Sequence, residues 1–566
     1  MLMNRWLLAG LMLLVGSWLM PHHYAPWLSF HGEFVAGAAA LVLSAGVAAH
    51  GAYARLPSPV ALPALLGLVA LGADFLSGRA LFASDLGYGL VYLGLWVLAG
   101  VAGAHMAATA SVSQRDPASA EPGAWSRAWS PLAWAILAGA LLSEMAGTVQ
   151  WLRWPTGLWV AASDGRAYAN FAQPNHYATL LAMGLAALGM LRAAQRIPHA
   201  IWLTGVLLLC CGVLSSESRT GFVAVTIIFA GWAAHRAAVT KRVAPWVCLL
   251  GALGLWLGAR LAWPALAQLV GATASRRASD FSSNGRFDLW QQLGAAVAEQ
   301  PWIGYGWLQV GRAQDLVAHT LPGPVVGFSH NLFLDVALWF GLPCALLLLL
   351  MCVRWLYKSF SVALPERLHP LLLLAPLGLH ALLEYPHAYA YFLVPAAIAV
   401  GALAQSTRSP AWAVPRWLLS GLMILCALAG MALAQLQISA EGPMRAALAD
   451  DNRFGAAAPA EVPLVAMGLG GDVKALVQAL SHTGPESAAS MEQAQRVAWR
   501  YPQKATHRRR VMSQFLGGQA VTACRSLQAF RSLYGLEQYQ NLLVSLRLAL
   551  QSSDTPFDIE TICQKI

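Results

Sequence analysis

Long apolar runs separated by short polar loops occupy the chain up to about residue 435. An apolar run of about 20 residues can cross a bilayer as a helix. The pattern predicts about 13 membrane-spanning helices, at residues 6–20, 32–50, 58–75, 87–108, 129–149, 175–193, 199–215, 220–238, 244–262, 330–353, 369–384, 388–405 and 416–435.

The last part of the chain has a different pattern. Residues 437–566 mix amphipathic helical runs, such as "VKALVQAL" and "YQNLLVSLRLAL", with glycine and proline breaks. This pattern predicts a small helical soluble domain without a clean repeat period. We therefore expect an all-α polytopic membrane protein, with a transmembrane domain at 1–436 and a C-terminal soluble helical domain at 437–566.

The basic residues of the short loops predict the orientation in the membrane. One alternate set of loops carries 14 Lys and Arg residues, whereas the opposite set carries four, namely Arg79, Arg153, Arg166 and Arg219. Because basic loops stay in the cytoplasm, the N-terminus is expected inside and the long loop at about 263–328 outside. An odd number of spans also puts the tail outside, and one span more or fewer would move it to the cytoplasm.

The composition agrees with a membrane protein. Hydrophobic residues make up 58% of the chain and charged residues only 11%, where a soluble domain is near a quarter charged. The net charge of +10 is explained by the cytoplasmic loops, so nucleic-acid binding is not expected. Residues 5–20 lack a small-residue cleavage site and precede many other spans, which favours an uncleaved first span over a signal peptide.

The eight cysteines do not form a metal-binding pattern. Six lie in or beside apolar runs, where a cysteine acts as a small packing residue. Cys524 and Cys563 lie in the polar tail, where a disulfide and two unpaired thiols are both compatible with the sequence. No CxxC pair or Cys/His metal spacing is present.

Polar residues collect in four clusters, and the predicted orientation places all four on the outer face. They are "NFAQPNHYA" from Asn170, "SSESRTG" from Ser215, "SHN" at 329–331 and "EYPHAYAYF" from Glu384. Each cluster lies where a span begins on its way inward, so each offers a helix N-terminus. Pro174 suits a first helical turn, and Ser218 and Ser329 are good N-caps. Several helix N-termini at one depth predict an anion site, especially for phosphate.

The external loop adds positive charge and aromatic rings. Arg276, Arg277 and Arg286 could bind phosphate in a bidentate manner, and Arg219 adds a fixed positive charge to the clusters. Trp290 and Trp302 could stack on a sugar or an isoprenoid. Taken singly, His330 is typical of a packing residue, Arg219 of a snorkelling anchor, and Tyr385, Tyr389 and Tyr391 of an aromatic belt. The coincidence of four clusters and a basic loop favours a functional site.

Two motifs resemble a known family. The ordered set Arg286, Trp290, Pro301, Gly304, Gly306, Ser329-His330-Asn331 and Gly341 resembles the signature of the O-antigen ligase/polymerase superfamily. "NFAQPNHYATLL" is similar to the corresponding segment of bacterial protein O-oligosaccharyltransferases, the pilin-glycosylating branch, which also carries an extra C-terminal domain. The resemblance covers most of the chain from about residue 165 onward.

The resemblance implies a multi-pass enzyme of the bacterial inner membrane whose active site faces the periplasm. Such enzymes transfer a glycan from undecaprenyl pyrophosphate to a hydroxyl group, which belongs to Ser or Thr of a pilin-like periplasmic protein in this branch. The essential histidine then corresponds to His330, and the pyrophosphate-binding arginines to Arg219 and Arg286. Four further positions are expected to orient the substrates: Gln173, Asn175, Asn331 and Tyr385. Neither a metal nor another cofactor is implied.

The residues themselves support the same chemistry. A pyrophosphate leaving group develops negative charge, which arginines and helix N-termini can stabilise without a metal. No acidic D-x-D or His cluster suggests a bound cation. The acceptor hydroxyl is a weak nucleophile, and the imidazole of His330 is suited to act as its base or orienting partner. We expect Ser329 to cap the following helix, Asn331 to support one of its two neighbours, and the anomeric carbon to be inverted.

Two other functions fit parts of the sequence. An O-antigen ligase would use the same chemistry on lipid A core, but the extra tail favours a protein acceptor. A transporter could relay protons through Glu384, His387 and His330. Transporters usually bury polar groups near the membrane midplane and show paired repeats, whereas these groups gather at one face and no repeat is visible.

Overall fold

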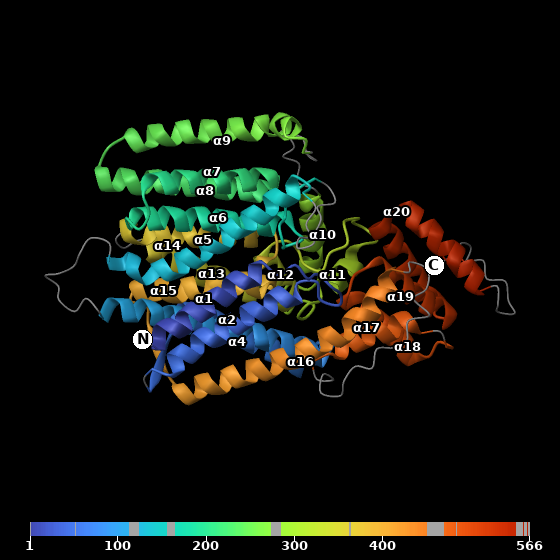
Figure 1. The fold of residues 1–566 in the computed structure, drawn as a ribbon. Coiled ribbons are helices and arrows are strands. Elements are labelled where there is room, and N and C mark those ends of the chain that lie inside the picture. The colour runs from blue at the N-terminus through green and yellow to red at the C-terminus, as the bar shows by residue number, and fades with distance from the viewer. Residues whose placement is uncertain are drawn as a thin grey trace. The chain divides into compact units, whose positions relative to one another are not determined.

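The computed structural model describes residues 2–50, 52–112, 124–154, 165–272, 285–360, 364–449, 469–482 and 484–550, together with Ile559 and Cys563. Helices make up most of this part of the chain (Figure 1), so the predicted all-α class is confirmed. Contacts divide the chain into two compact units. Met1–Leu65, Val91–Phe281 and Leu350–Gly430 form the first, and Leu66–Leu90, Ser282–Leu349 and Met431–Ile566 form the second. The division into domains at 1–436 and 437–566 stays a prediction.

Most predicted spans coincide with one helix each. These helices are α1 (Leu2–Trp18), α2 (Phe30–Ala48), α3 (Ser58–Leu76), α4 (Ala83–Val112), α5 (Ala124–Trp151), α6 (Pro174–Ala193), α7 (His199–Ser215), α8 (Arg219–Thr240), α9 (Ala244–Leu269), α13 (Leu342–Phe360), α14 (Leu364–Leu383), α15 (Ala390–Ser406) and α16 (Arg416–Ala449). Among the described residues, eight helices are long and apolar enough to cross a membrane: α2, α3, α4, α5, α8, α9, α13 and α16. The chain is therefore a multi-pass membrane protein, and the number of 13 spans stays a prediction.

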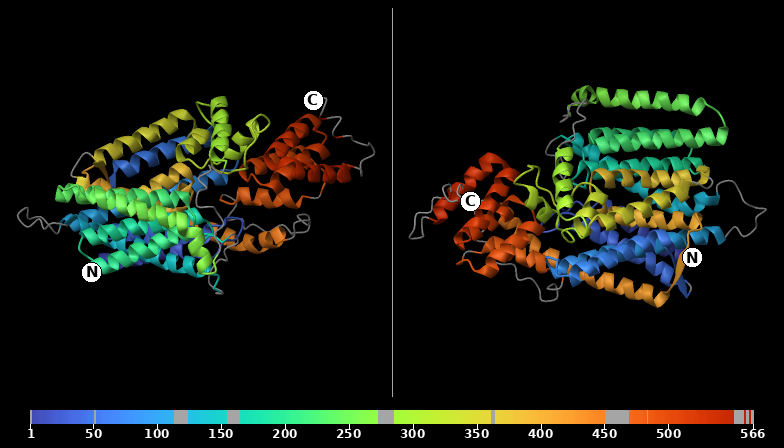
Figure 2. Two further views of the ribbon diagram at one scale, coloured as in Figure 1. Left: turned by 90° about the horizontal axis from the view of Figure 1, so that it is seen from above. Right: turned by 180° about the vertical axis from the view of Figure 1, so that it is seen from behind.

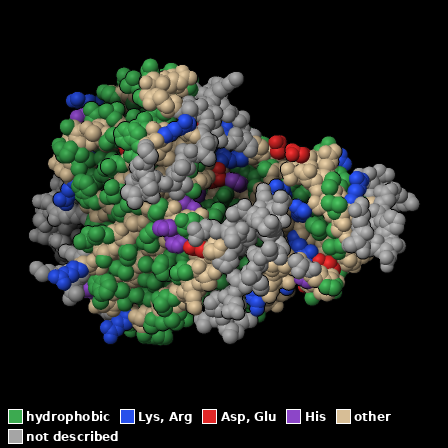
Figure 3. Space-filling model, turned by 45° about the vertical axis from the view of Figure 1, so that its right-hand side comes forward, with side chains coloured by type: hydrophobic (Ala, Val, Ile, Leu, Met, Phe, Trp, Pro, Cys, Tyr) green, Lys and Arg blue, Asp and Glu red, His purple; other side chains and the backbone are tan. Residues whose placement is uncertain are grey.

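The first unit is built around α6. Every side chain from His176 to Leu191 is buried, and α5, α7, α8 and α14 pack against this helix (Figure 1). The polar first turn of α6 therefore faces protein rather than lipid, which lowers the cost of placing polar groups at membrane depth. Large apolar side chains are exposed elsewhere, as on α9, where Leu250 is 70% and Leu255 78% exposed. On the face that Figure 3 shows, many of the described side chains are hydrophobic, as expected for contact with lipid.

A short antiparallel sheet joins two loops of the first unit. β1 (Tyr53–Pro57) pairs with β2 (Ala411–Pro415), and Arg55 lies opposite Ala413. The sequence analysis did not predict these strands, but it placed both loops on the same side of the membrane. Because β1 and β2 pair with each other, both loops must lie on the same side of the membrane.

The second unit contains the predicted external loop. Its described helices are α10 (Arg286–Glu299), α11 (Val310–Val317) and α12 (Leu332–Phe340), followed by the first residues of α13. The predicted continuous span at 330–353 is wrong, because Gly341 has a φ of 86° and separates α12 from α13. The apolar stretch after His330 is therefore a nine-residue helix followed by a separate helix that is long enough to cross a membrane.

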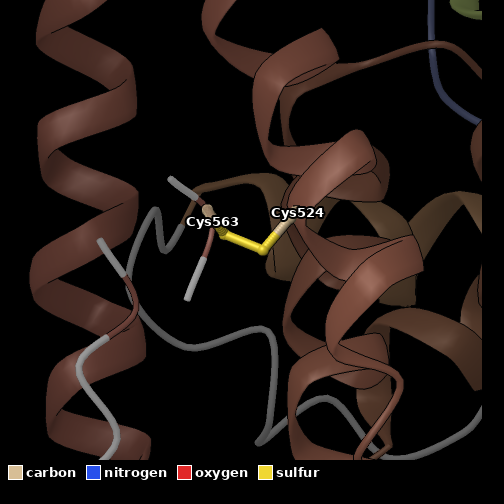
Figure 4. Close-up of a disulfide and its surroundings, with 2 residues drawn as sticks. All are labelled: Cys524 and Cys563. Carbon is tan, nitrogen blue, oxygen red and sulfur yellow. A yellow bond between two sulfur atoms is a disulfide. The ribbon is translucent and has the colours of Figure 1, made fainter. Parts of the chain in front are cut away.

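The tail folds into α17 (Gly471–Ser481), α18 (Ala488–Arg500), α19 (Lys504–Leu516) and α20 (Ala520–Leu550), and each of these helices packs on the next. Both views in Figure 2 show them as one group in orange to red. Val511, Phe515, Phe530 and Leu546 are buried in its core. Cys524 and Cys563 form a disulfide with a Cα–Cα distance of 5.3 Å (Figure 4), which decides between the two alternatives left open above.

The tail contacts the external loop within the second unit. Both terminal nitrogens of Arg510 donate to the carboxylate of Asp315 on α11, at 2.7 and 2.8 Å, and the indole of Trp499 donates to the same carboxylate. Burial alone would raise the pKa of Asp315, but the adjacent Arg510 holds it below the usual value. The guanidinium of Arg500 also binds Asp85 of α4 at 2.7 Å. The tail and the loop therefore lie on one side of the membrane, and which side this is stays a prediction.

His507 is expected to make the stability of the tail depend on pH. Burial lowers the pKa of its imidazole from 6.5 to about 3, and the charge of Arg510 acts in the same direction. Between these pH values the unfolded tail binds a proton that the folded tail does not. The free energy of unfolding therefore falls by up to about 1.4 kcal/mol per pH unit as the pH is lowered from 6.5 towards 3, with no contribution above 6.5.

Hydrogen exchange of the α19 and α20 amides in the full-length protein, corrected for intrinsic rates, measures this dependence. The variant His507→Gln has no titrating group at this position, so its protection should depend less on pH in the same range. An unchanged pH dependence in His507→Gln would show that other groups cause the effect.

Candidate active site

The amide of Asn175 joins three of the polar clusters predicted to share one face. Its Nδ2 donates to Glu384 Oε1 at 2.9 Å, and its Oδ1 accepts from the hydroxyl of Ser218 at 2.7 Å. Asn175 lies in the first turn of α6, Ser218 directly before α8, and Glu384 directly after α14. The structure thus brings together segments that are 43 and 209 residues apart in sequence.

Two capped helix N-termini lie beside this amide. Gln173 Oε1 accepts the backbone N–H of His176 at 2.8 Å, and Pro174 follows as the first residue of α6. The hydroxyl of Ser218 accepts the N–H of Gly221 at 3.1 Å, so its predicted capping role is confirmed. Arg219 is the first residue of α8 and is half-buried. Its charge and the positive ends of α6 and α8 make this part of the first unit favourable for an anion.

Aromatic rings connect Tyr385 to the same helix. Tyr385 stacks on Tyr389 with 5.9 Å between ring centroids, and Tyr389 and His176 pack edge to face with 4.5 Å between centroids. The Nδ1 of His176 lies 3.0 Å from the hydroxyl of Tyr391. Tyr389 and Tyr391 therefore pack against His176 of α6, and Tyr385 is linked to this helix through Tyr389.

The SHN segment lies in the second unit and forms a tight turn before α12. Asn331 is the N-cap, and its Oδ1 accepts the N–H groups of Phe333 and Leu334 at 3.0 and 3.2 Å. The prediction that Ser329 caps this helix is therefore wrong. Ser329 is fully buried two residues earlier, where its hydroxyl donates to the carbonyl of Asn331 at 2.9 Å.

His330 has an unusual backbone. Its φ of 61° is in the left-handed region, which costs a non-glycine residue about 1–3 kcal/mol. Such a conformation persists only where the surrounding structure imposes it, and strained residues of this kind gather at functional sites. The side chain is half-buried. The SHN segment therefore holds the backbone of His330 in a defined conformation, which sets where its side chain leaves the chain.

Helix α10 brings Arg286 towards the same turn. Arg286 is the first residue of α10, after Gly285 with a φ of 73°. Trp290 lies four residues later, on the same helix face, and its indole N–H donates to the carbonyl of Ser329 at 2.9 Å. Trp302, in contrast, is 76% exposed. Arg276 and Arg277 lie outside the described residues.

The Pro-x-x-Gly-x-Gly turn binds the other end of α12. The N–H of Tyr305 donates to the carbonyl of Leu338 at 2.7 Å, and that of Gly306 to the carbonyl of Trp339 at 3.0 Å. These bonds satisfy two carbonyls that have no partner within the helix. Gly304 has a φ of 64°, and a Cβ atom there would lie 2.6 Å from the carbonyl oxygen of Leu338, so the turn requires glycine.

This turn is also tied to the end of α3. The carboxylate of Asp74 accepts the N–H of Trp307 at 3.0 Å, and Arg79 donates to the carbonyl of Ile303 at 2.5 Å. Arg79 and Asp74 form an ion pair at 3.2 Å. Arg79, counted among the outer-loop arginines, thus supports the turn beneath α12.

The structure brings the predicted site residues into two groups. Asn175, Gln173, Arg219 and Tyr385 lie in the first unit, whereas Arg286, His330 and Asn331 lie in the second. The sequence analysis missed Asp335, whose buried carboxylate accepts the N–H of Ser329 at 2.6 Å. The sequence did contain a signal for this role, namely an acidic residue in the first helical turn after the SHN segment. The part of the chain that the structure describes holds no group of three or more His, Cys, Asp or Glu placed to bind a metal ion.

Three family models match this chain. One described as O-antigen ligase matches residues 204–350, which include α8 and the SHN turn. One described as protein glycosylation ligase matches residues 167–191, which include Gln173 and Asn175. A third, described as virulence factor membrane-bound polymerase, C-terminal, matches residues 369–547 and so extends into the tail.

Two curated proteins of Acinetobacter baylyi are similar to the chain. A general O-oligosaccharyltransferase is 29% identical over 424 residues, which are 70% of this chain and 70% of that protein. A ComP-specific O-oligosaccharyltransferase is 27% identical over 257 residues, which are 43% of this chain and 45% of that protein. Both names describe the activity that the sequence resemblance implied. The resemblance is therefore confirmed: these relatives support an oligosaccharyltransferase activity, and the chain carries segments that match the O-antigen ligase and protein glycosylation ligase models.

Proposed function

We propose that this protein transfers an oligosaccharide as one unit from undecaprenyl pyrophosphate to Ser or Thr hydroxyls of a pilin-like periplasmic protein, without a metal ion. The observation that carries the proposal is the SHN turn. It holds His330 in a left-handed conformation between Ser329, which is buried, and Asn331, which caps α12. An imidazole on a constrained backbone directly before a short helix suits a general base or an orienting partner for a hydroxyl group.

In the proposed reaction, the hydroxyl oxygen of the acceptor bonds to the anomeric carbon of the first sugar. The bond between that carbon and the pyrophosphate oxygen breaks, and the configuration is inverted. His330 takes the proton of the hydroxyl group, and the pyrophosphate leaves on its lipid with the electron pair. Transfer of the whole glycan thus needs one displacement and no redox partner.

The leaving group is stabilised by positive charge. Arg286 at the start of α10 and Arg219 at the start of α8 can each bind phosphate oxygens in a bidentate manner. The N-termini of α6 and α8 add positive dipole ends beside Arg219. Preorganised donors of this kind lower the energy of a transition state in which negative charge develops. Gln173, Asn175, Asn331 and Tyr385 are assigned the role of orienting the substrates. Gln173 also caps α6, and Asn331 also caps α12.

Three observations support a periplasmic active site in the bacterial inner membrane. The disulfide between Cys524 and Cys563 is typical of an oxidising compartment, and the periplasm is one. The tail that carries this disulfide binds the loop that carries Arg286, through the contact of Arg510 with Asp315. The excess of basic residues in the opposite loops agrees with this orientation.

The acceptor is the part of the proposal that separates it from an O-antigen ligase. Both curated relatives are named O-oligosaccharyltransferases, one of them general and the other ComP-specific. The present chain also has a folded tail beside its loop, which gives a protein acceptor a surface to contact. We therefore expect a protein acceptor rather than lipid A core.

A two-acceptor assay tests the function. Purified full-length protein is given one lipid-linked glycan, together with either a pilin-like protein or lipid A core, in the presence and absence of EDTA. We expect glycan on Ser or Thr of the protein, none on lipid A core, and a rate with EDTA within about twofold of the rate without it. Transfer to lipid A core alone would favour the ligase, and loss of activity with EDTA would overturn the metal-free reaction.

A further inference from the structure

The backbone of Ser329, the residue directly before His330, is held at both of its polar groups. Its N–H donates to Asp335 Oδ1 at 2.6 Å, and its carbonyl accepts from Trp290 Nε1 at 2.9 Å. Its hydroxyl donates to the carbonyl of Asn331 at 2.9 Å. Ser329 and Asp335 are both fully buried, so water does not compete for the bond between them. One residue thus has its N–H, carbonyl and hydroxyl group all engaged.

The conformation of the next residue needs such an arrangement. His330 has a φ of 61°, which an unrestrained histidine would relax towards negative values. The bonds to Ser329 on one side and the cap formed by Asn331 on the other fix both ends of this turn. They also fix the direction of the Cα–Cβ bond of His330, and hence the region that the imidazole can reach.

Trp290 extends this arrangement to the proposed phosphate site. It lies one helical turn after Arg286 on the same face of α10, and its indole ends on the carbonyl directly before His330. The side chains proposed to bind the leaving group and to meet the acceptor are therefore tied together through one hydrogen bond.

We infer that Asp335 and Trp290 are positioning residues, which hold the turn so that the imidazole of His330 and the guanidinium of Arg286 meet one substrate. This inference rests on the proposed function of these two residues. Neither Asp335 nor Trp290 needs to touch the substrate for this role. A buried acid in the first turn of a helix could instead stabilise only the helix. The two roles make different predictions for kinetics.

Four full-length variants separate the two roles. Asp335→Ala removes the acceptor of the Ser329 N–H, whereas Asp335→Asn keeps an oxygen at that place. Trp290→Phe keeps an aromatic ring and removes only its N–H donor. Glu299→Ala is the matched control, because it removes an exposed carboxylate from the far end of α10.

The assay is glycan transfer from the lipid-linked donor, with kcat and KM measured separately. A misplacement of about 1 Å can cost about 100-fold in rate, so we expect Asp335→Ala to lower kcat about 100-fold and Trp290→Phe about 10-fold. We expect KM for the donor to stay within about threefold, because binding outside the reacting centre is kept. Asp335→Asn should recover most of the kcat, and Glu299→Ala should match the parent.

A second comparison uses the His330→Ala background. If Asp335 and Trp290 act through His330, their substitutions cost little further activity there, since effects within one unit are not additive. The inference is overturned if Asp335→Ala and Trp290→Phe keep kcat within about twofold of the parent. It is also overturned if they cause the same fold-loss with and without His330. Full activity of His330→Ala itself would overturn the proposed function instead, so the two failures are distinguishable.

Discussion

Replacement of His330 by alanine is expected to lower kcat for glycan transfer by about 10²–10⁴-fold, the range typical of a lost general base. The reason is that an acceptor hydroxyl is a weak nucleophile and that the SHN turn holds the backbone of His330 in one conformation. Alanine also removes any orienting hydrogen bond to that hydroxyl. The measurement is transfer of glycan from the lipid-linked donor to a protein acceptor, with the variant and the parent at equal amounts of folded protein in the membrane.

Two further substitutions make this result interpretable. His319→Ala removes an exposed histidine from the same loop and should leave the rate unchanged. His330→Asn is the sharper variant, because asparagine tolerates the left-handed conformation and can bond to a hydroxyl group, but is not a base at neutral pH. A rate as low as that of alanine assigns proton removal to His330. A rate close to that of the parent would mean that His330 only orients the acceptor.

The sequence predicted most of the helices because the signal for each is local. An apolar run of spanning length forms a helix almost regardless of its neighbours, since the backbone in lipid must bond to itself. The break at Gly341 was not predicted, because the sequence stays apolar from α12 into α13. What ends α12 is the turn at 301–306, whose N–H groups take the carbonyls of Leu338 and Trp339. That pairing is invisible in the local pattern. The same holds for β1 and β2, which lie more than 350 residues apart in sequence.

The sequence predicted which polar clusters would share one face, but it did not predict the hydrogen bonds between their residues. Orientation put the polar clusters on one face, and the contacts of Asn175 with Ser218 and Glu384 confirm that three of them meet. The sequence could not show which residue caps α12, since Ser329 and Asn331 are both good N-caps. The choice is decided by Asp335 and Trp290, which hold Ser329 outside the helix. The pairing of Arg510 with Asp315 was equally hidden, because 195 residues separate them.

Replacement of Arg286 by alanine is expected to lower kcat by about 10²–10³-fold, and replacement of Arg219 to have an effect of the same size. Both residues are proposed to stabilise the pyrophosphate as it leaves, and removal of one preorganised donor of this kind costs about that much. Lysine at either position keeps the charge but loses the bidentate geometry, so it should recover only part of the rate. The readouts are kcat for transfer and inhibition of transfer by added inorganic pyrophosphate.

Inhibition separates binding of phosphate from a general loss of structure. If Arg286 and Arg219 bind phosphate oxygens, each alanine variant needs at least about 10-fold more pyrophosphate for half-inhibition, because a charge-assisted bidentate contact is lost. Arg525→Ala removes an exposed arginine from the tail and should change neither readout. An unchanged half-inhibiting concentration in an arginine variant with low kcat would exclude phosphate binding by that residue. Its role would then be to hold the end of α8 or of α10, and the stabilisation of the leaving group would rest on the other arginine and on the helix N-termini.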